Sequence, residues 1–512
     1  MMLVLTTRGL ETFVTGPFEE KKILGRILTF EDPSAERSRA FKTGFWDGQI
    51  RLYDRDQDMF LSGLVGMVQA GLRESGVETT VVDETPRPPV TREVPADLFP
   101  GIQLRDYQVS AIRKGLLQGG GICKIPTRGG KTFVAAGFLK LIGLPSIFLV
   151  GQVQLLRQTV QVLRERLGFP SVGKIGDGVY DPAFHTVVTV QSAYELIRRR
   201  DPGFLQFIHN IKVLVIDECQ HASALSWEVV ARSIPALYRF GLSGTPYKTR
   251  DRGSYEDFLL LGICGPPCSI IPTWTLVEQG WIAQPLIYLL PVTDPCRGSS
   301  WAKVYEKGIV THPGRNRAAL LATQGLVSKG HQTLVLVQRK EHGKAFLRSL
   351  GEKGISAVFL MGGDVVWVQD GEKVRETRDV VDGEISRVRE EFRRGEHQVL
   401  IATSVLDEGV DLPEVGALVL LSGGKSFVKT LQRLGRALCP KPGDNQVYIV
   451  DFLDRQHPWL QAHSRAREKE YLSERHTVLG AAEFWARFGL TGVDTSPVPD
   501  LLWSVTPQEG GK

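Results

Sequence analysis

The chain has 512 residues, of which 42% are hydrophobic, and this is material for about three domains at the usual ~100 to 200 residues each. No segment approaches the ~20 apolar residues that span a bilayer, and the first residues are too soon acidic for a signal peptide, so we expect a cytoplasmic protein and no membrane partner. The net charge of +5 is uneven, because residues 101–455 hold 44 Lys and Arg against 34 Asp and Glu, which slightly favours a polyanionic partner.

Residues 1–85 are predicted to form a small N-terminal α+β domain, an accessory or nucleic-acid-binding module. Within it, the Asp47–Gly48 pair favours a tight hairpin turn with Trp46 and Tyr53 packed beside it. Residues 86–100 are rich in proline and are predicted to be a stiff linker.

Short runs of Val, Ile and Leu alternate with amphipathic, helix-length segments through the middle of the chain, as is typical of buried parallel strands. The predicted strands are 146–150, 186–190 and 213–216, then 284–291, 333–337, 399–402, 417–421 and 447–450. The fold class is therefore predicted to be α/β, with two tandem lobes at residues 101–285 and 286–455. Residues 456–512 are predicted to be a C-terminal helical extension that ends in a disordered tail.

Residues 126–132 (PTRGGKT) follow an apolar run and open a predicted helix. Their two glycines let the backbone approach an anion, Lys131 adds a positive charge, and Thr132 can hold Mg²⁺. Ile125 stands where the full phosphate-loop pattern has Gly, so this motif alone also fits a helix start without a nucleotide.

Residues 216–221 (IDECQH) end a buried strand, and ligands of such sheets bind beyond the carboxyl ends of the strands. Asp217 can meet a hydrated magnesium ion, and Glu218 can orient or deprotonate an attacking water. A solvated acidic turn is the alternative, but the position downstream of a phosphate loop favours a catalytic role.

Four further segments follow the same order along the chain: residues 104–108 (LRDYQ), 243–246 (SGTP), 402–411 (ATS to EGVD) and 432–436 (QRLGR). With these six motifs the chain resembles the superfamily-two helicases over roughly residues 100–455. The resemblance implies two RecA-like lobes that use ATP and Mg²⁺ to move on nucleic acid.

The resemblance also implies roles for single residues. Catalysis is expected from Lys131, Asp217, Glu218, Gln432 and Arg436, of which Arg436 belongs to the second lobe. Nucleotide binding is expected from Arg105, Gln108 (which would pair with adenine), Pro126, Thr127, Arg128, Gly129, Gly130, Lys131, Thr132, Gly409 and Asp411, and Mg²⁺ binding from Thr132 and Asp217. Nucleic-acid contacts are expected from Gln152, Gln191 and Thr403, and coupling of the two sites from Gln220, Ser243 and Thr245.

Three positions depart from the family pattern. Arg128 stands where many members have Gly, and Gln220 stands where many have His. Cys439 replaces the last Arg of the arginine-finger motif, whose role Lys441 could take. The last departure puts the hydrolysis rate in doubt more than ATP binding.

Two local features bear on the kind of helicase. Residues 44–53 (GFWDGQIRLY) resemble a signature of the phage UvsW-type helicases, which implies branched DNA as substrate, 3′ to 5′ movement and the host cytoplasm. Residues 364–378 alternate apolar and polar side chains around Asp370–Gly371, which predicts a hairpin. It could guide strands, or Trp367 could simply pack on the lobe.

We therefore expect an ATP-dependent DNA helicase or translocase that unwinds or remodels branched DNA in recombination, repair or fork processing. A duplex translocase without net unwinding, an RNA helicase and an ATP-gated clamp with little turnover are the alternatives. A monomer suffices because both lobes belong to one chain, although a protein partner could supply a missing arginine.

Overall fold

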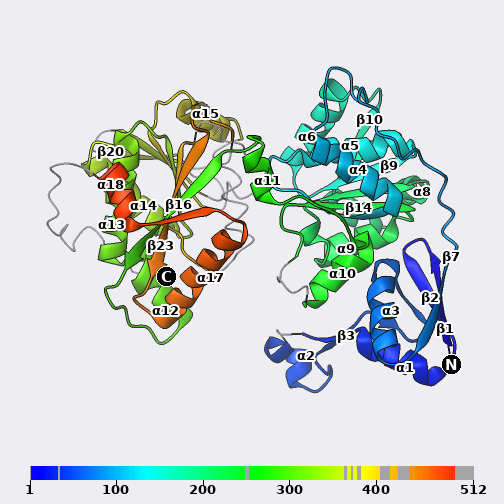
Figure 1. Cartoon of the computed structure of the whole chain (residues 1–512). Coiled ribbons are helices and arrows are strands. Elements are labelled where there is room, and N and C mark those ends of the chain that lie inside the picture. The colour runs from blue at the N-terminus through cyan, green and yellow to red at the C-terminus, as the bar shows by residue number, and fades with distance from the viewer. Residues whose placement is uncertain are drawn as a thin grey trace. The chain divides into compact units, whose positions relative to one another are not determined.

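The computed structural model describes residues 2–32, 35–247, 253–361, 366–370, 373–377, 382–403, 415–424, 439–441 and 443–489. The chain divides into two compact units, Met1–Ile271 and Pro272–Lys512 (Figure 1). The domain limits expected from the sequence stay predictions. Among the described residues, no helix is long and apolar enough to cross a membrane.

The first unit begins with a five-stranded sheet of the predicted α+β domain. Its strands, in order, are β5 (Tyr53–Asp54), β6 (Met59–Leu61), β2 (Glu11–Thr15), β1 (Met2–Arg8) and β7 (Glu78–Asp83), and β7 runs parallel to β1. Alternate residues of β1 are buried, and Leu3 and Leu5 are fully enclosed. This apolar face is covered by α1 (Phe18–Ile27) and α3 (Val65–Glu74), as period-two alternation requires.

The tight hairpin expected at Asp47–Gly48 is wrong. The strand that follows, β4 (Gln49–Arg51), pairs with β3 (Thr29–Glu31), and the connection between them contains α2 (Arg39–Lys42). Gly48 does have a left-handed φ of +77°, and the Asp47 carboxylate accepts a hydrogen bond from the Gln49 N–H at 3.0 Å. The Asp-Gly signal therefore marked a real change of direction but could not identify the distant partner strand.

The remainder of the first unit is lobe 1, built on an eight-stranded sheet. The strand order is β11 (Val179–Asp181), β10 (Val172–Gly176), β12 (His185–Thr189), β9 (Ser146–Val150), β13 (Val213–Asp217), β14 (Tyr238–Ser243), β8 (Gly120–Lys124) and β15 (Pro267–Ile270). All neighbours are parallel except β10 and β11. The helices are α4 (Asp106–Gln118), α5 (Lys131–Ile142), α6 (Val153–Gln161), α7 (Val190–Arg198), α8 (Pro202–His209), α9 (Leu225–Ser233) and α10 (Tyr255–Cys264).

Alternate residues of β14 fix which helices cover each face of this sheet. Phe240 stacks on Phe138 of α5 with ring centroids 3.8 Å apart, whereas Gly241 leaves room for Cys264 of α10. Both faces are therefore buried, which explains why the central strands read as continuous apolar runs.

The second unit, lobe 2, has a nine-stranded sheet. The order is β20 (Lys373–Thr377), β19 (Val366–Asp370), β18 (Ala357–Leu360), β21 (Val399–Ala402), β17 (Thr333–Leu336), β22 (Ala417–Val419), β23 (Gln446–Asp454), β16 (Gln284–Val292) and β24 (Thr477–Gly480). The helices include α11 (Thr273–Glu278), α12 (Trp301–Tyr305), α13 (Pro313–Ser328), α14 (Lys340–Glu352), α15 (Asp382–Arg393), α17 (Pro458–Ser473) and α18 (Ala481–Phe488). The two mainly parallel sheets confirm the predicted α/β class.

Two details of lobe 2 bear on the sequence predictions. Strands β19 and β20 pair in antiparallel fashion with Asp370 opposite Lys373, which confirms the hairpin, although its role stays a prediction. The C-terminal extension is helical as expected, but it also supplies β24, which runs parallel to β16 and was not predicted. The predicted disordered tail, residues 490–512, lies outside the described residues.

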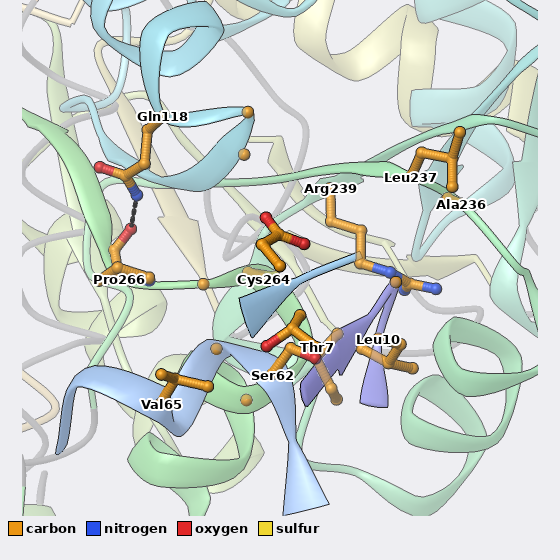
Figure 2. A pocket seen from close by; sticks show the side chains of 18 of the residues that line it. Thr7, Leu10, Ser62, Val65, Gln118, Ala236, Leu237, Arg239, Cys264 and Pro266 are labelled. Carbon is orange, nitrogen blue, oxygen red and sulfur yellow. Dashed lines mark hydrogen bonds between the residues drawn. The ribbon is translucent and has the colours of Figure 1, made fainter. Parts of the chain in front are cut away.

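The N-terminal domain and the proline-rich linker pack on lobe 1. Phe30 stacks on Phe258 of α10 at 4.6 Å, and the Tyr238 hydroxyl donates to the Pro88 carbonyl at 2.5 Å. A cavity of about 260 Å³ remains at this junction, between Ser62 on one side and Arg239 on the other (Figure 2). The domain thus packs closely against the lobe that carries the phosphate loop.

Candidate functional site

Apart from Arg105 and Gln108 at the start of α4, the predicted site residues of lobe 1 follow the carboxyl ends of five strands. The phosphate loop follows β8, Asp217 ends β13 and Ser243 ends β14, whereas Gln152 and Gln191 follow β9 and β12. Because these strands are parallel neighbours in one sheet, all five loops lie at the same edge. The Gln191 side chain donates to the carbonyl of Gly151 at 2.8 Å, so it joins the β9 and β12 loops.

A partly buried ion pair lies at the centre of this edge. Lys131 is the first residue of α5, and its Nζ lies 2.5 Å from Glu218 Oε1. Burial alone would lower the pKa of Lys131, but the carboxylates of Glu218 and Asp217 outweigh it and raise the pKa. Burial likewise opposes ionisation of Glu218, yet Lys131 holds its pKa below the ordinary value. Both partners are therefore charged at neutral pH.

Asp217 is in a different electrostatic position from its neighbour. Burial, reinforced by the negative charge of Glu218 and only partly offset by Lys131, raises the pKa of Asp217 to about 6. Its Oδ1 accepts a hydrogen bond from the Glu218 N–H at 3.0 Å. A carboxylate with so little compensation gains from an added cation, which suits a metal ligand.

A chain of hydrogen bonds links the ion pair to the SGTP segment. Gln220 donates through Nε2 to Glu218 Oε2 at 2.9 Å and accepts at Oε1 from the Ser243 hydroxyl at 2.6 Å. The Thr245 N–H then donates to Ser243 Oγ at 2.9 Å. The expected link between Gln220 and Thr245 therefore passes through Ser243. The Thr245 hydroxyl is buried and has no hydrogen-bond partner among the described residues.

The LRDYQ segment forms hydrogen bonds with the phosphate loop. Gln108, only 4% exposed, donates to the Gly129 carbonyl at 3.1 Å and accepts at Oε1 from the Arg105 N–H at 2.9 Å. Tyr107 donates to the same carbonyl at 2.9 Å and accepts from Arg105 at 2.7 Å. The amide that would pair with adenine is thus engaged with the chain. The sequence motif contains Tyr107 but gave no indication of this role.

The phosphate loop has the shape that an anion requires. Gly130 caps α5 with φ +76°, and a Cβ added there would lie 2.3 Å from Gln108 Nε2, so only glycine fits. Arg128 also has a left-handed φ of +67°, which agrees with the family's preference for Gly at this position. Pro126 and Thr127 lead from β8 into this turn, and Thr132 is the second residue of α5. The N–H groups at the start of α5 and the positive charge of Lys131 fit a phosphate group.

The predicted residues of lobe 2 are only partly described. Thr403 follows β21, is 7% exposed and donates its N–H to the Leu360 carbonyl at 3.2 Å. Gly409, Asp411, Gln432 and Arg436 lie outside the described residues. Cys439 is 1% exposed, so the position of the missing arginine is packed inside lobe 2.

Comparisons with known proteins agree with the motif order. Residues 101–248 match the family described as Type III restriction enzyme, res subunit, and residues 317–441 match Helicase conserved C-terminal domain. The DNA 3'-5' translocase XPB2 of Sulfurisphaera tokodaii is 26% identical over 77% of this chain and 90% of its own length. The ATP-dependent DNA helicase uvsW of Enterobacteria phage T4 is 23% identical over 84% of this chain and 86% of its own.

A solved structure shows the same fold. The ATP-dependent Type ISP restriction-modification enzyme LlaBIII bound to DNA aligns with a TM-score of 0.53 at 15% identity, covering 76% of this chain and 32% of that one. At this level of identity the likeness concerns the arrangement of strands and helices alone.

Proposed function

The chain belongs to the superfamily-two helicases and is related to the phage UvsW enzyme, and on this premise we propose that it is an ATP-dependent DNA helicase or translocase. The observation that carries the proposal is the hydrogen-bonded relay from Lys131 to Thr245. It joins a phosphate-binding lysine to the segment that couples ATP to nucleic acid in the resembling family. A simple phosphatase has no need of such a link.

In the proposed cycle Lys131 exchanges its partner. Phosphate oxygens would attract Lys131 away from Glu218, which leaves the Glu218 carboxylate to orient the attacking water and accept its proton. Thr132 and Asp217 would hold Mg²⁺, which supplies charge neutralisation at the phosphates when bound. Gln220, bonded to Glu218, would then pass the change to Ser243 and Thr245.

The residues outside the described ranges keep their predicted roles as part of the proposal. Gln432 and Arg436 would act on the phosphates from lobe 2, and Gly409 and Asp411 would contribute to nucleotide binding. The domain limits expected from the sequence, with residues 1–85 as the accessory module, belong to the same proposal.

DNA is the proposed substrate because the names of the relatives specify it. Gln152, Gln191 and Thr403 would contact the sugar-phosphate backbone of the DNA, so binding would depend little on base sequence. The affinity for DNA would fall steeply as the salt concentration rises. We extend the proposal to branched DNA, 3′ to 5′ movement and a role in recombination, repair or fork processing in the host cytoplasm. A monomer suffices.

Steady-state ATP hydrolysis tests this proposal. The rate is measured without nucleic acid and with single-stranded DNA, forked DNA and matched RNA, at two salt concentrations. Stimulation by forked DNA that weakens with salt supports the proposal, whereas stronger stimulation by RNA indicates an RNA helicase. Tight ATP binding with no stimulation indicates a clamp. Displacement of a triplex strand without opening of a fork identifies a duplex translocase.

A further inference from the structure

One peptide group of the phosphate loop is held by two buried side chains. The Gly129 carbonyl accepts hydrogen bonds from the Tyr107 hydroxyl at 2.9 Å and from Gln108 Nε2 at 3.1 Å. Arg105 Nη1 donates to the Tyr107 hydroxyl at 2.7 Å, so this hydroxyl is itself held in place. The direction of the Gly129 carbonyl is therefore fixed by side chains of a single segment.

The fixed carbonyl also determines where the next N–H points. In a planar trans peptide, the carbonyl of one residue and the N–H of the following residue point in opposite directions. The Gly130 N–H therefore points away from Tyr107 and Gln108. Among the described residues, none accepts a hydrogen bond from this N–H, and α5 begins at the next residue, Lys131. An N–H oriented in this way beside a lysine can donate to a phosphate oxygen.

The Gln108 amide has no atom left for a base. Its Nε2 donates to the Gly129 carbonyl, and its Oε1 accepts from the Arg105 N–H at 2.9 Å, in the first turn of α4. Bidentate pairing with adenine uses the oxygen and the nitrogen of a glutamine amide together. Such pairing would break one hydrogen bond to the phosphate loop and one that caps α4.

Tyr107 is a permanent donor at neutral pH. Burial raises the pKa of its hydroxyl above the ordinary value, and the opposing effect of Arg105 is smaller. The hydroxyl therefore stays protonated and continues to donate to Gly129. A simple need to satisfy a buried hydroxyl is the alternative explanation, and it makes no demand on phosphate binding.

We propose that Tyr107 and Gln108 are positioning residues that orient the Gly130 N–H toward the phosphates, so that the LRDYQ segment contributes to binding of the triphosphate and not to recognition of adenine. The inference deepens the proposed function and rests on it, because it assumes that ATP binds at the phosphate loop. It implies that exchange of adenine for guanine has little effect on the contribution of this segment.

Tyr107→Phe is the sharpest test, because it removes one hydroxyl and keeps the ring. Tyr238→Phe is the matched control, since Tyr238 is also a buried tyrosine of lobe 1 that donates to a backbone carbonyl, that of Pro88. Gln108→Ala removes the other donor and serves as a second variant. For wild type and each variant, the dissociation constants of a non-hydrolysable ATP analogue, its GTP counterpart and inorganic tripolyphosphate are measured with Mg²⁺, together with Tm.

We expect Tyr107→Phe to weaken binding of all three ligands by the same factor, roughly fivefold, which corresponds to one neutral hydrogen bond. Gln108→Ala should weaken all three by a similar factor. Tyr238→Phe should leave each dissociation constant within about twofold of wild type, and its Tm should match that of Tyr107→Phe. Because tripolyphosphate has no base, an equal loss for this ligand assigns the effect to the phosphates.

A loss confined to the ATP analogue in Gln108→Ala would show that this side chain reads adenine, and would overturn the inference. Unchanged affinity for tripolyphosphate in Tyr107→Phe would overturn it as well. If wild type binds none of the three ligands, the premise of a phosphate site fails and the inference falls with the proposed function. If wild type binds them but DNA does not stimulate hydrolysis, the proposed function fails, while the two variants still decide the positioning role.

Discussion

Lobe 1 and lobe 2 bury charged side chains in opposite ways. In lobe 1, Lys131 has Glu218 as its hydrogen-bonded partner, and the adjacent Asp217 has a pKa raised to about 6. In lobe 2, Arg467 meets Asp451 through two hydrogen bonds and donates further to backbone carbonyls. In lobe 1 a ligand can replace one partner of the ion pair, and we call this pair exchangeable. In lobe 2 further hydrogen bonds hold the ion pair in place, and we call this pair locked.

The difference teaches how to distinguish a working ion pair from a structural one. An exchangeable pair lies at a ligand-accessible edge and leaves a neighbouring charge poorly compensated. A locked pair is fully desolvated and has hydrogen bonds on both partners. Mutations that remove one partner should therefore affect activity in lobe 1 and stability in lobe 2.

The largest effect is expected for Lys131→Ala. We expect ATP hydrolysis to fall by about 10³-fold or more, because the phosphate charge loses its main partner. Tm should change by only a few degrees, since Gln220 still bonds Glu218. Lys140→Ala, on the same helix, is the control, because Lys140 is exposed and lies over the Phe99 ring. Appreciable turnover in Lys131→Ala would refute the site assignment.

Arg467→Met probes the locked pair. It leaves the buried Asp451 with hydrogen bonds from the Tyr471 hydroxyl and the Phe452 N–H but without its charged partner, so we expect a loss of about 3 to 5 kcal/mol in the free energy of unfolding of lobe 2. Denaturant unfolding measures this loss. A double variant that also carries Asp451→Leu should recover most of it. A stability loss below about 1 kcal/mol in the single variant would mean that the pair is not locked.

Gln220→Ala tests whether the lobe 1 ion pair is coupled to DNA binding through the hydrogen bonds to Ser243 and Thr245. We expect DNA stimulation of hydrolysis to fall roughly tenfold while the basal rate stays within a few fold, because the relay loses its middle member and Lys131 and Glu218 remain. The ratio of stimulated to basal kcat is the measurement. Gln118→Ala removes a comparable amide bond, to the Pro266 carbonyl, and should leave the ratio unchanged. An unchanged ratio in Gln220→Ala would break the proposed relay.

The smallest effect concerns pH and the neutral polar core of lobe 2. Burial, aided by Arg315, lowers the pKa of His342 to about 3, whereas in the unfolded chain it is about 6.5. Between these values the unfolded state binds more protons, so stability is complete above about pH 6.5 and falls as pH decreases, by at most ~1.4 kcal/mol per pH unit.

Unfolding at pH 5.0 and 7.5, taken as about one and a half units below and one unit above the ordinary histidine pKa, measures this slope. His342→Gln should flatten it, because the amide can still meet Asn316 without titrating. His185 and His476, whose pKa values burial lowers to about 4, should leave a residual slope. If the variant shows the same dependence of unfolding free energy on pH as wild type, His342 is not responsible for it.

The sequence predicted what is written locally and missed what depends on distant partners. Apolar runs located strands of both sheets, and the motifs placed Lys131, Asp217 and Glu218 at one sheet edge. However, β14 and β18 were not predicted, and β23 extends beyond the expected residues 447–450 to Asp454. Three features depend on tertiary contacts that the sequence does not show: the pairing of β4 with β3, the strand β24, and the role of Ser243 as the link between Gln220 and Thr245. Arg315 and Arg467 carried no local signal, because an arginine in a helix usually indicates a solvated face.

The pairing of β16 with β23 has a consequence for the order in which the chain folds during synthesis. These strands pair along residues 284–292 and 446–454, so β16 must wait for more than 150 further residues before its neighbour exists. The lobe 1 sheet, by contrast, has all its strands by Ile270. We therefore expect lobe 1 to fold early on the ribosome, while β16 stays exposed until translation passes β23 and β24 closes its other edge.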